Sequence, residues 1–418
     1  QTLESKIVDT VQEKVENGIV GEITDTVRGV AETAGELVDA AGNAVTDAAA
    51  EPARFGPELD PLGRTIEAET WIILVPAEYA DRIASWGFTI RRREDLATLN
   101  RVLLTVAAPE DRDIAQAALE LALDAPGTQV DFNHVYRPGA EPDGDGLAAK
   151  PAVPAVAPPH SPAPARSVGI IDTAVATEHE ALREADIVQR DFVPFTNERP
   201  TAHGTAVASI LVGSAARLHA QLRGGRVYAA SVFFEDESGD DATTAASLTV
   251  AGEWLAAEGV HVINMSLAGP PNRVLEAAIQ ALVGRGVVVV AAVGNNGPTG
   301  EPLYPAAYPN VVGVTAVDAA QRVYRYANRG PHVRFAAPGV DIRVAKSGGG
   351  LRDMTGTSIA SPYAAAVIAQ TLATRTGATP ASVVAELERA AVDLGAKDFD
   401  SVFGFGLIEP LTPITASR

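Results

Sequence analysis

Cysteine is absent from the 418-residue chain. Its absence excludes a disulfide framework, a thiolate nucleophile and a zinc site built on cysteine ligands. Basic residues are also few, since 33 Lys and Arg stand against 53 Asp and Glu and give a net charge of -20. Because binding of a phosphate backbone requires a basic surface, we expect no nucleic acid as the main partner.

Long apolar runs are missing as well. No stretch of 18 or more apolar residues occurs, so the sequence predicts no transmembrane segment. The hydrophobic fraction of 46% and the charged fraction of 21% are typical of globular proteins. The length favours two or three folded units. Only five of the bases are lysine and alanine is abundant, a composition that suggests a bacterial gene.

Residues 1–55 carry apolar side chains at steps of three and four, which predicts an amphipathic helix. The polar positions are mainly acidic, and several glycines lower the helix propensity. Three interpretations remain open for this extension. It is a solvated spacer, a helix packed on its own protein, or a helix that binds a partner or a surface.

Residues 64–138 have a different texture, with alternating short strands and helices. The predicted order is strand, helix, strand, strand, helix, strand, which is the order of a ferredoxin-like α+β module. The corresponding segments are 70–75, 77–87, 88–96, 101–108, 111–123 and 128–136. Residues 139–166 follow as a Pro/Ala-rich stretch without apolar periodicity, which predicts an extended linker.

From residue 167 to 418, short β-branched runs alternate with alanine-rich helical stretches. Fully apolar strands separated by helices predict an α/β domain with a mainly parallel sheet flanked by helices. In such sheets the functional residues lie at the carboxyl ends of the strands. The predicted strands are 168–172, 227–234, 260–267, 287–293 and 311–318.

Three residues of nucleophilic or acid–base type lie in glycine-flanked motifs of this domain. Asp172 ends the run VGIID, His203 stands in HGTAVAS, and Ser358 lies in GTSIASP before an alanine-rich helix. Each alone has a structural interpretation, as a cap or a packed residue. Together they keep the chain order Asp, His, Ser, which is the order of the subtilisin triad, and no G-x-S-x-G motif of an α/β-hydrolase occurs.

Asn295 lies in the glycine-bracketed turn of AAVGNNGP, after the most apolar predicted strand. An amide at such a position can donate a hydrogen bond to an oxyanion, an interaction worth about 3 to 4 kcal/mol.

Residues 167 to about 410 resemble the subtilisin-like serine proteases. The stretches that carry the resemblance are, in family order, GIIDTAV, HGTAVAS, INMSLAGP, AAVGNNGP, YPAAYPNVVGVTAVD, FAAPGV, GTSIASP and FGFGLI. The resemblance implies a serine endopeptidase in which Asp172 orients the base His203 and Ser358 is the nucleophile. It also implies an oxyanion hole formed by Asn295 and the Ser358 backbone N–H.

The resemblance has further implications for partners and compartment. Residues 64–138 are similar to the family's propeptide, an intramolecular chaperone and inhibitor, so the chain is expected to be a self-inhibited precursor. Protein or peptide substrates are the other expected partners, and the expected localisation is bacterial and exported, either periplasmic or extracellular. The competing hypothesis is a catalytically silent subtilase fold that acts as an interaction protein presented by residues 1–55.

The specificity pocket departs from the family pattern in two places. The resemblance places one pocket wall at Ser266, Leu267, Ala268 and Gly269, where Ala268 replaces a frequent glycine. Leu303 stands where subtilisins often have glycine at the pocket base. Both side chains remove volume, so we expect a preference for Gly, Ala or Ser before the scissile bond. The alternative is that Leu303 points away from the pocket.

Metal binding is not assigned. Between Val207 and Arg226 the chain has no Asp or Asn, so the calcium loop of many subtilisins is not expected there. Residues 235–241 form an acidic loop beside the expected substrate strand. It is a solvated loop, a surface calcium site, or an attractor of basic residues upstream of the cut. No cofactor is required, and calcium stays possible without an assigned site.

The expected self-cleavage site follows the last predicted strand of the propeptide-like segment. Alignment with family propeptides places Tyr136 four residues before the cut and Gly139 immediately before it. Pro138 favours extended geometry and Gly139 suits a shallow pocket. We therefore expect cleavage after Gly139 or Ala140, with a cut farther along the linker as the alternative.

Overall fold

The computed structural model describes residues 57–109, 112–139, 167–194, 198–215, 218, 220–222 and 224–411. The expected N-terminal helix and the expected linker beyond Gly139 lie outside these residues. The chain divides into two compact units between Asn133 and His134. This division falls inside strand β5 (Gln129–Pro138), so residues 134–138 belong to the second unit.

The first unit contains a sheet with the strand order β3-β4-β2-β5. Antiparallel pairs join β4 to both β2 and β3, and β1 pairs with β2. This order and the two intervening helical segments have the ferredoxin-like pattern expected from the sequence. The elements are β1 (Pro57–Leu59), β2 (Thr65–Pro76), β3 (Ile90–Leu96), β4 (Arg101–Ala107) and α4 (Ile114–Asp124).

The predicted continuous helix over 77–87 is wrong. The segment consists of the 3₁₀ turns η1 (Ala77–Tyr79) and η2 (Ala84–Trp86) on either side of the short helix α3 (Ala80–Ile83). Within α3, only Ala80 and Ile83 are buried. A segment this short needs a buried face to form a stable α-helix, and two buried side chains supply only one turn of it.

The second unit is built on a seven-stranded sheet with the order β15-β14-β13-β11-β6-β8-β7. All of its strand pairs are parallel. The five strands expected from the sequence are present, and two further strands form its edges. The bounds are β6 (Val168–Asp172), β7 (Asp186–Asp191), β8 (Arg226–Ser231), β11 (Val262–Met265), β13 (Val288–Ala292), β14 (Val312–Val317) and β15 (Val333–Pro338).

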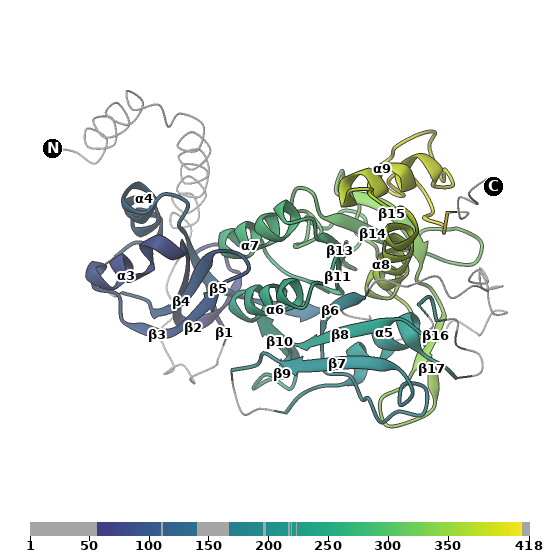
Figure 1. Cartoon of the computed structure of the whole chain (residues 1–418), viewed down its shortest axis with the longest axis horizontal. Coiled ribbons are helices and arrows are strands. Elements are labelled where there is room, and N and C mark those ends of the chain that lie inside the picture. Colours follow the sequence, from purple (N-terminus) through teal and green to yellow (C-terminus); the bar gives the residue numbers. More distant parts are fainter. Residues whose placement is uncertain are drawn as a thin grey trace. The chain divides into compact units, whose positions relative to one another are not determined.

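Helices cover both faces of this sheet (Figure 1). On one face, α5 and α8 pack on the central strands, and α9 packs on α8. On the other face, α6 contacts β6 and β8, while α7 contacts β13 and α6. The helices are α5 (Ala202–Val212), α6 (Ala245–Ala257), α7 (Arg273–Gly284), α8 (Thr357–Thr374) and α9 (Pro380–Ala390).

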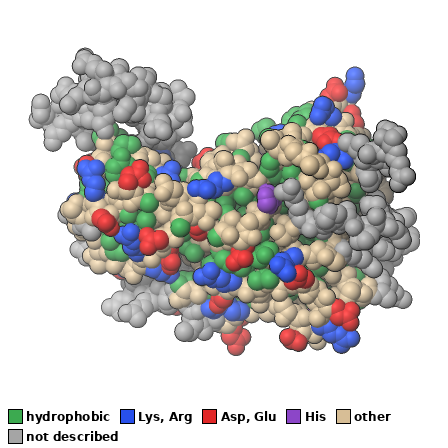
Figure 2. Space-filling model, in the orientation of Figure 1, with side chains coloured by type: hydrophobic (Ala, Val, Ile, Leu, Met, Phe, Trp, Pro, Cys, Tyr) green, Lys and Arg blue, Asp and Glu red, His purple; other side chains and the backbone are tan. Residues whose placement is uncertain are grey.

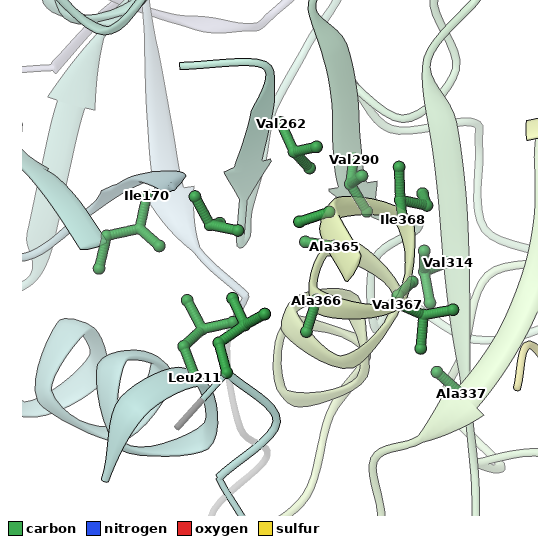
Figure 3. Packing of buried hydrophobic residues seen from close by; sticks show 14 of the residues in the cluster. Ile170, Leu211, Val262, Val290, Val314, Ala337, Ala365, Ala366, Val367 and Ile368 are labelled. Carbon is green, nitrogen blue, oxygen red and sulfur yellow. The ribbon is translucent and has the colours of Figure 1, made fainter. Parts of the chain in front are cut away.

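The main core lies between the sheet and the face formed by α5 and α8. Small side chains of α8, such as Ala365 and Ala366, let the helix approach Val290 and Val314 of the strands (Figure 3). Leu211 of α5 fills the space beside Ile170 of β6. Both helices are therefore fixed against the sheet by close packing of buried apolar side chains.

Short strands outside the main sheet complete the second unit. The pairs β9–β10 and β16–β17 are antiparallel. The bounds are β9 (Phe234–Glu235), β10 (Asp241–Thr244), β12 (Leu267–Ala268), β16 (Ile342–Ala345) and β17 (Leu351–Met354).

Acidic and basic side chains are interspersed on the visible surface of the described residues (Figure 2). Many of them form ion pairs, such as Arg226 with Asp186 and Arg343 with Asp353. Within the described part of the chain, no helix is both long enough and apolar enough to cross a membrane.

Val290 and Val188 allow a matched test of the core. Val290 is fully buried, whereas Val188 on the edge strand β7 is 37% exposed. Val290→Ala should lower the free energy of unfolding by about 2 kcal/mol, because two buried methyl groups are lost. Val188→Ala should lower it by less than about 1 kcal/mol. Urea denaturation followed by circular dichroism measures both, and equal losses would contradict this description of the core.

Candidate active site

Asp172 is the last residue of β6, and its side chain is only 1% exposed. β6 lies between β8 and β11, and the chain runs from β6 to β7 and β8 on one side before it crosses back to β11 on the other. At such a switch point, the loops after neighbouring strands separate and leave room for a site. The Thr173 N–H donates to Asp172 Oδ1 over 2.7 Å, which fixes the rotation of the carboxylate.

His203 lies in the first turn of α5 and faces Asp172. Its Nδ1 lies 2.8 Å from Asp172 Oδ1 and 3.0 Å from Oδ2. A carboxylate at Nδ1 holds the ring proton on that atom, so Nε2 is the basic nitrogen. Both side chains are buried, so the interaction is little weakened by solvent.

Gly204 holds the start of α5 against β6. Its backbone N–H donates to Thr173 Oγ1 over 2.7 Å. A Cβ atom at this position would lie 2.2 Å from the Thr173 carbonyl oxygen, a distance that no side chain tolerates. Glycine is therefore required here so that the helix approaches closely enough for His203 to meet Asp172.

Ser358 lies in the first turn of α8, after Gly356 at the N-cap, and is fully buried. Pro362 has no N–H to donate to the Ser358 carbonyl four residues earlier. The Ser266 hydroxyl donates to that carbonyl instead, over 2.8 Å. The first turn of α8 is thus anchored to the loop that follows β11.

Asn295 is oriented by Thr357, the residue that precedes Ser358. The Thr357 N–H and hydroxyl both donate to Asn295 Oδ1, over 3.1 and 3.0 Å. The Thr357 hydroxyl also accepts the Gly294 N–H over 3.2 Å. With Oδ1 occupied, the Nδ2 amide is presented to the opposite side, where Ser358 lies.

Gly139 marks the point where Ser358 and Asn295 converge. A Cβ atom on Gly139 would lie 3.2 Å from Ser358 Oγ and 3.5 Å from Asn295 Nδ2. The Gly139 N–H donates to the Ser266 carbonyl over 3.4 Å. The backbone of Gly139 is therefore held directly against the serine hydroxyl and the asparagine amide.

Residues 134–138 form an extended strand that leads to Ser358. On one side, Arg137 and Pro138 pair antiparallel with Ala268 and Leu267 of β12. On the other side, the strand pairs antiparallel with β10, where Tyr136 lies opposite Thr243. An extended segment held between two strands in this manner has the geometry of a bound peptide.

Tyr136 fills a closed pocket three residues before Gly139. Its side chain is fully buried, and its hydroxyl donates to the Pro270 carbonyl over 2.8 Å. The ring lies on Gly269, where a Cβ atom would come within 2.4 Å of it. Burial raises the pKa of the nearby Tyr308 hydroxyl well above its usual value.

The five residues expected to line the specificity pocket have different positions. The Ser266 hydroxyl is buried against α8, so only its backbone carbonyl contacts Gly139. Leu267 is buried, and Ala268 pairs with Arg137. The Leu303 side chain packs on the backbone of Gly294, where a Cβ atom would lie 2.5 Å from Leu303 Cδ1. Its neighbour Tyr304 pairs with Gly269 through two backbone hydrogen bonds of 2.9 and 3.0 Å.

Two supporting residues were not identified from the sequence. Thr173 directly follows Asp172; its N–H binds the Asp172 carboxylate and its hydroxyl accepts the Gly204 N–H. Thr357 directly precedes Ser358, and its hydroxyl donates to the Asn295 side chain. Their adjacency to the candidate residues was the available signal. Asp241 is the last residue of the acidic loop at residues 235–241. Burial raises the pKa of Asp241, and the proximity of His203 lowers it less strongly.

The expected residue Ala140 lies outside the described residues. Among the residues that the structure describes, no group of three or more His, Asp or Glu side chains is arranged to hold a metal ion.

Comparison with known proteins assigns the second unit. The model of the subtilase family, Peptidase_S8, matches residues 165–406. The chain belongs to the subtilase family. Subtilisin from Bacillus pumilus is 30% identical over 250 residues, which are 58% of this chain and 88% of that protein.

Solved structures agree with this assignment. A serine-to-alanine mutant of the protease domain of PatA is 29% identical, with a TM-score of 0.52, over 58% of this chain and 92% of that chain. Fervidolysin from Fervidobacterium pennivorans, a keratinolytic enzyme, shares the fold, with a TM-score of 0.64 at 19% identity. That likeness covers 84% of this chain and 61% of fervidolysin. The expected subtilisin-like fold is confirmed, and the chain is a serine endopeptidase of this family.

Gly204→Ala tests the close approach of α5. The added Cβ must displace the helix from Thr173, so the melting temperature should fall and kcat/KM should drop by about 100-fold as His203 is misplaced. Gly284→Ala, at the end of α7, is the matched control, because a Cβ there has no atom within 4 Å. It should leave both properties nearly unchanged. Normal activity of Gly204→Ala would refute this account of the helix start.

Proposed function

We propose that Asp172, His203 and Ser358 form the catalytic triad and that Asn295 donates to the oxyanion. Two observations carry this proposal: the convergence of Ser358 Oγ and Asn295 Nδ2 on the backbone of Gly139, and the hydrogen bond within the buried Asp172–His203 pair. A backbone held at this point lies where a scissile peptide would be attacked.

The chemistry follows from the residue types. His203 Nε2 takes the proton of the Ser358 hydroxyl as the oxygen attacks the peptide carbonyl carbon. The tetrahedral intermediate then collapses, the C–N bond breaks, and His203 returns the proton to the leaving amine. Water repeats the sequence on the acyl-enzyme and releases the carboxylic acid. Asp172 stabilises the imidazolium formed in each step and keeps the ring in one orientation.

Asn295 acts when negative charge appears on the carbonyl oxygen. Because Thr357 holds Oδ1, the amide Nδ2 is already oriented and needs no reorganisation during the reaction. The Ser358 backbone N–H, at the start of α8, is the second proposed donor. The positive end of the helix dipole supports the same charge.

The segment ending at Gly139 is proposed to be the first substrate and the inhibitor of the protease. Support comes from its pairing with β10 and β12, and from the burial of Tyr136. These contacts favour a cut between Gly139 and Ala140 over the other expected bond, after Ala140. The chain is then a self-inhibited precursor.

The preference for small residues before the scissile bond is part of the same proposal. Leu303 packs on Gly294 beside Asn295, and its neighbour Tyr304 pairs with Gly269 of the proposed pocket wall. The Leu303 side chain leaves less depth there than a glycine would. Export from a bacterial cell also stays within the proposal, supported by the 30% identity over 246 residues to the minor extracellular protease Epr of Bacillus subtilis. The proposed reaction needs no cofactor, and calcium has no assigned site.

Ser358→Ala is the central test. The variant should lower kcat on peptides by roughly 10⁶-fold and should stay folded as an uncleaved chain, because no nucleophile remains. Ser382→Ala, an exposed serine of α9, is the control and should be active. Edman sequencing of the activated wild-type chain should begin at Ala140. A first residue beyond Lys150 would refute the placement, and failure of Ser358 to react with a fluorophosphonate would favour the silent interaction protein.

Leu303→Gly tests the pocket. Wild-type enzyme should cleave peptides with Ala before the scissile bond much faster than peptides with Phe, because Leu303 removes depth from the pocket. The variant should accept Phe at least about tenfold better, since a single side chain in such a pocket changes discrimination by about 1 to 3 kcal/mol. Leu303→Met, which nearly conserves volume, should keep the wild-type preference. Preference of the wild type for Phe would show that Leu303 does not line the pocket.

A further inference from the structure

The acidic loop at residues 235–241 is not solvated throughout, because one arginine is seated on it. Arg137 Nη2 lies 2.9 Å from Asp236 Oδ2, and Nη1 lies 3.8 Å from Asp240 Oδ2. Arg137 Nη1 also donates to the Asp241 carbonyl over 3.4 Å. One guanidinium group therefore contacts two carboxylates and a backbone carbonyl of the same loop.

The backbone register fixes the position of this arginine relative to Ser358. Gly139 lies against the serine and donates to the Ser266 carbonyl, while Arg137 pairs with Ala268. If the bond after Gly139 is cut, as the proposed function holds, Arg137 is the third residue before the scissile bond. In a strand, side chains alternate between the two faces, so Arg137 points to one face of β5 while Tyr136 and Pro138 point to the other.

Asp236 is held in place by hydrogen bonds within its own loop. Its Oδ1 accepts the backbone N–H groups of Ser238 and Asp240, over 2.9 and 3.1 Å. The Asp236 N–H also donates to the Asp240 carbonyl over 2.9 Å. Oδ1 is thus held by the backbone of the turn, and Oδ2 faces Arg137. A fixed acceptor loses little conformational entropy when a cation binds.

The charge of Asp236 is present under ordinary conditions. Burial raises the pKa of its carboxyl group, but the hydrogen bonds from Arg137 and from the N–H groups of Asp240 and Ser238 outweigh burial and leave the pKa below its usual value. The Asp236 side chain is only 13% exposed, against 68% for Asp240. Asp236 is consequently less screened by solvent and salt than Asp240.

We propose that Asp236, assisted by Asp240, makes this protease select peptides with arginine at the third position before the scissile bond. The planar guanidinium suits this site better than a lysine ammonium. Its Nη2 reaches Asp236, while its Nη1 reaches both Asp240 and the Asp241 carbonyl. A carboxylate at that position of a substrate would be repelled by the loop. This selection for arginine adds to the selection for an aromatic side chain at the fourth position, where Tyr136 is buried.

The experiment uses the full chain after self-processing and three fluorogenic peptides, Tyr-Arg-Pro-Gly, Tyr-Gln-Pro-Gly and Tyr-Glu-Pro-Gly, each ending in aminomethylcoumarin. The wild-type ratio of kcat/KM for Arg over Gln should be about 2 to 5, in the range expected for a partly exposed ion pair. Glu should be cleaved more slowly than Gln. Higher salt should reduce both differences.

Asp236→Asn removes the charge and keeps an oxygen that accepts the N–H groups of Ser238 and Asp240. The Arg over Gln ratio should fall to about 1, and the disadvantage of Glu should disappear. The matched control is Asp318→Asn. Asp318 Oδ1 accepts the Ala320 and Arg322 N–H groups, and its Oδ2 pairs with Arg322, in a turn that is built in the same way. This variant should keep the wild-type ratio.

The ratio is measured within each variant, so a lower yield of folded enzyme does not affect it. A wild-type ratio near 1, or an unchanged ratio in Asp236→Asn, would overturn the assignment and leave the proposed function intact. Failure to cleave all three peptides, together with an unreactive Ser358, would instead refute the proposed function, and the role of Asp236 with it.

Discussion

Parallel pairing of β6 with both of its neighbours is the constraint on which the site depends. The register aligns Asp172 with Ser231 of β8, and Ile171 with Met265 of β11, so the three strands end nearly level. All five residues of β6 are buried, so the strand cannot slip without exposing apolar surface. Asp172 is therefore fixed at an edge from which the neighbouring loops diverge.

A chain of buried hydrogen bonds links β11 to the first turn of α8 at this edge. Asn264 Nδ2 donates to the Ser266 hydroxyl, which donates to the Ser358 carbonyl left without an N–H by Pro362. An unsatisfied buried carbonyl costs about 1 to 3 kcal/mol. The proline that disturbs the helix thus makes Ser266 necessary, and the two together tie the first turn of α8 to the loop after β11. A rigid serine position results from these hydrogen bonds.

The sequence specified the central strands and the candidate residues because their signals are local. The run 168–172 is uniformly apolar and ends in a carboxylate, and β6 has those bounds. The edge strand β7 is not predicted by the sequence, because the side chains of DIVQRD are mainly exposed and show no apolar alternation. Such a composition is common in edge strands. The helical signal of 77–87 was misread because it depended on packing, which the sequence does not contain.

For the candidate site too, local motifs were predictable from the sequence, whereas contacts that depend on packing were not. Asp172, His203, Ser358 and Asn295 were proposed from motifs. The structure joins Asp172 to His203 by a hydrogen bond and brings Ser358 and Asn295 together at Gly139. The orientation of Ser266 was beyond the motif, because Ser266 lies between β11 and β12 and its hydroxyl meets α8 only through tertiary packing. The contacts of Thr357 with Asn295 likewise depend on a tertiary approach between β13 and α8 that no local pattern encodes.

Recognition in the groove combines two contributions of different kinds. Backbone pairing of residues 135–138 with β10 and β12 is available to any extended peptide, so it contributes affinity without sequence information. Discrimination must then come from side chains, and Tyr136 and Arg137 leave the strand on opposite faces, toward an enclosed apolar pocket and a charged loop. Breaking the bond after Gly139 removes none of these contacts. Under the proposed function, the segment that is cleaved first therefore still competes with later substrates for the same two strands.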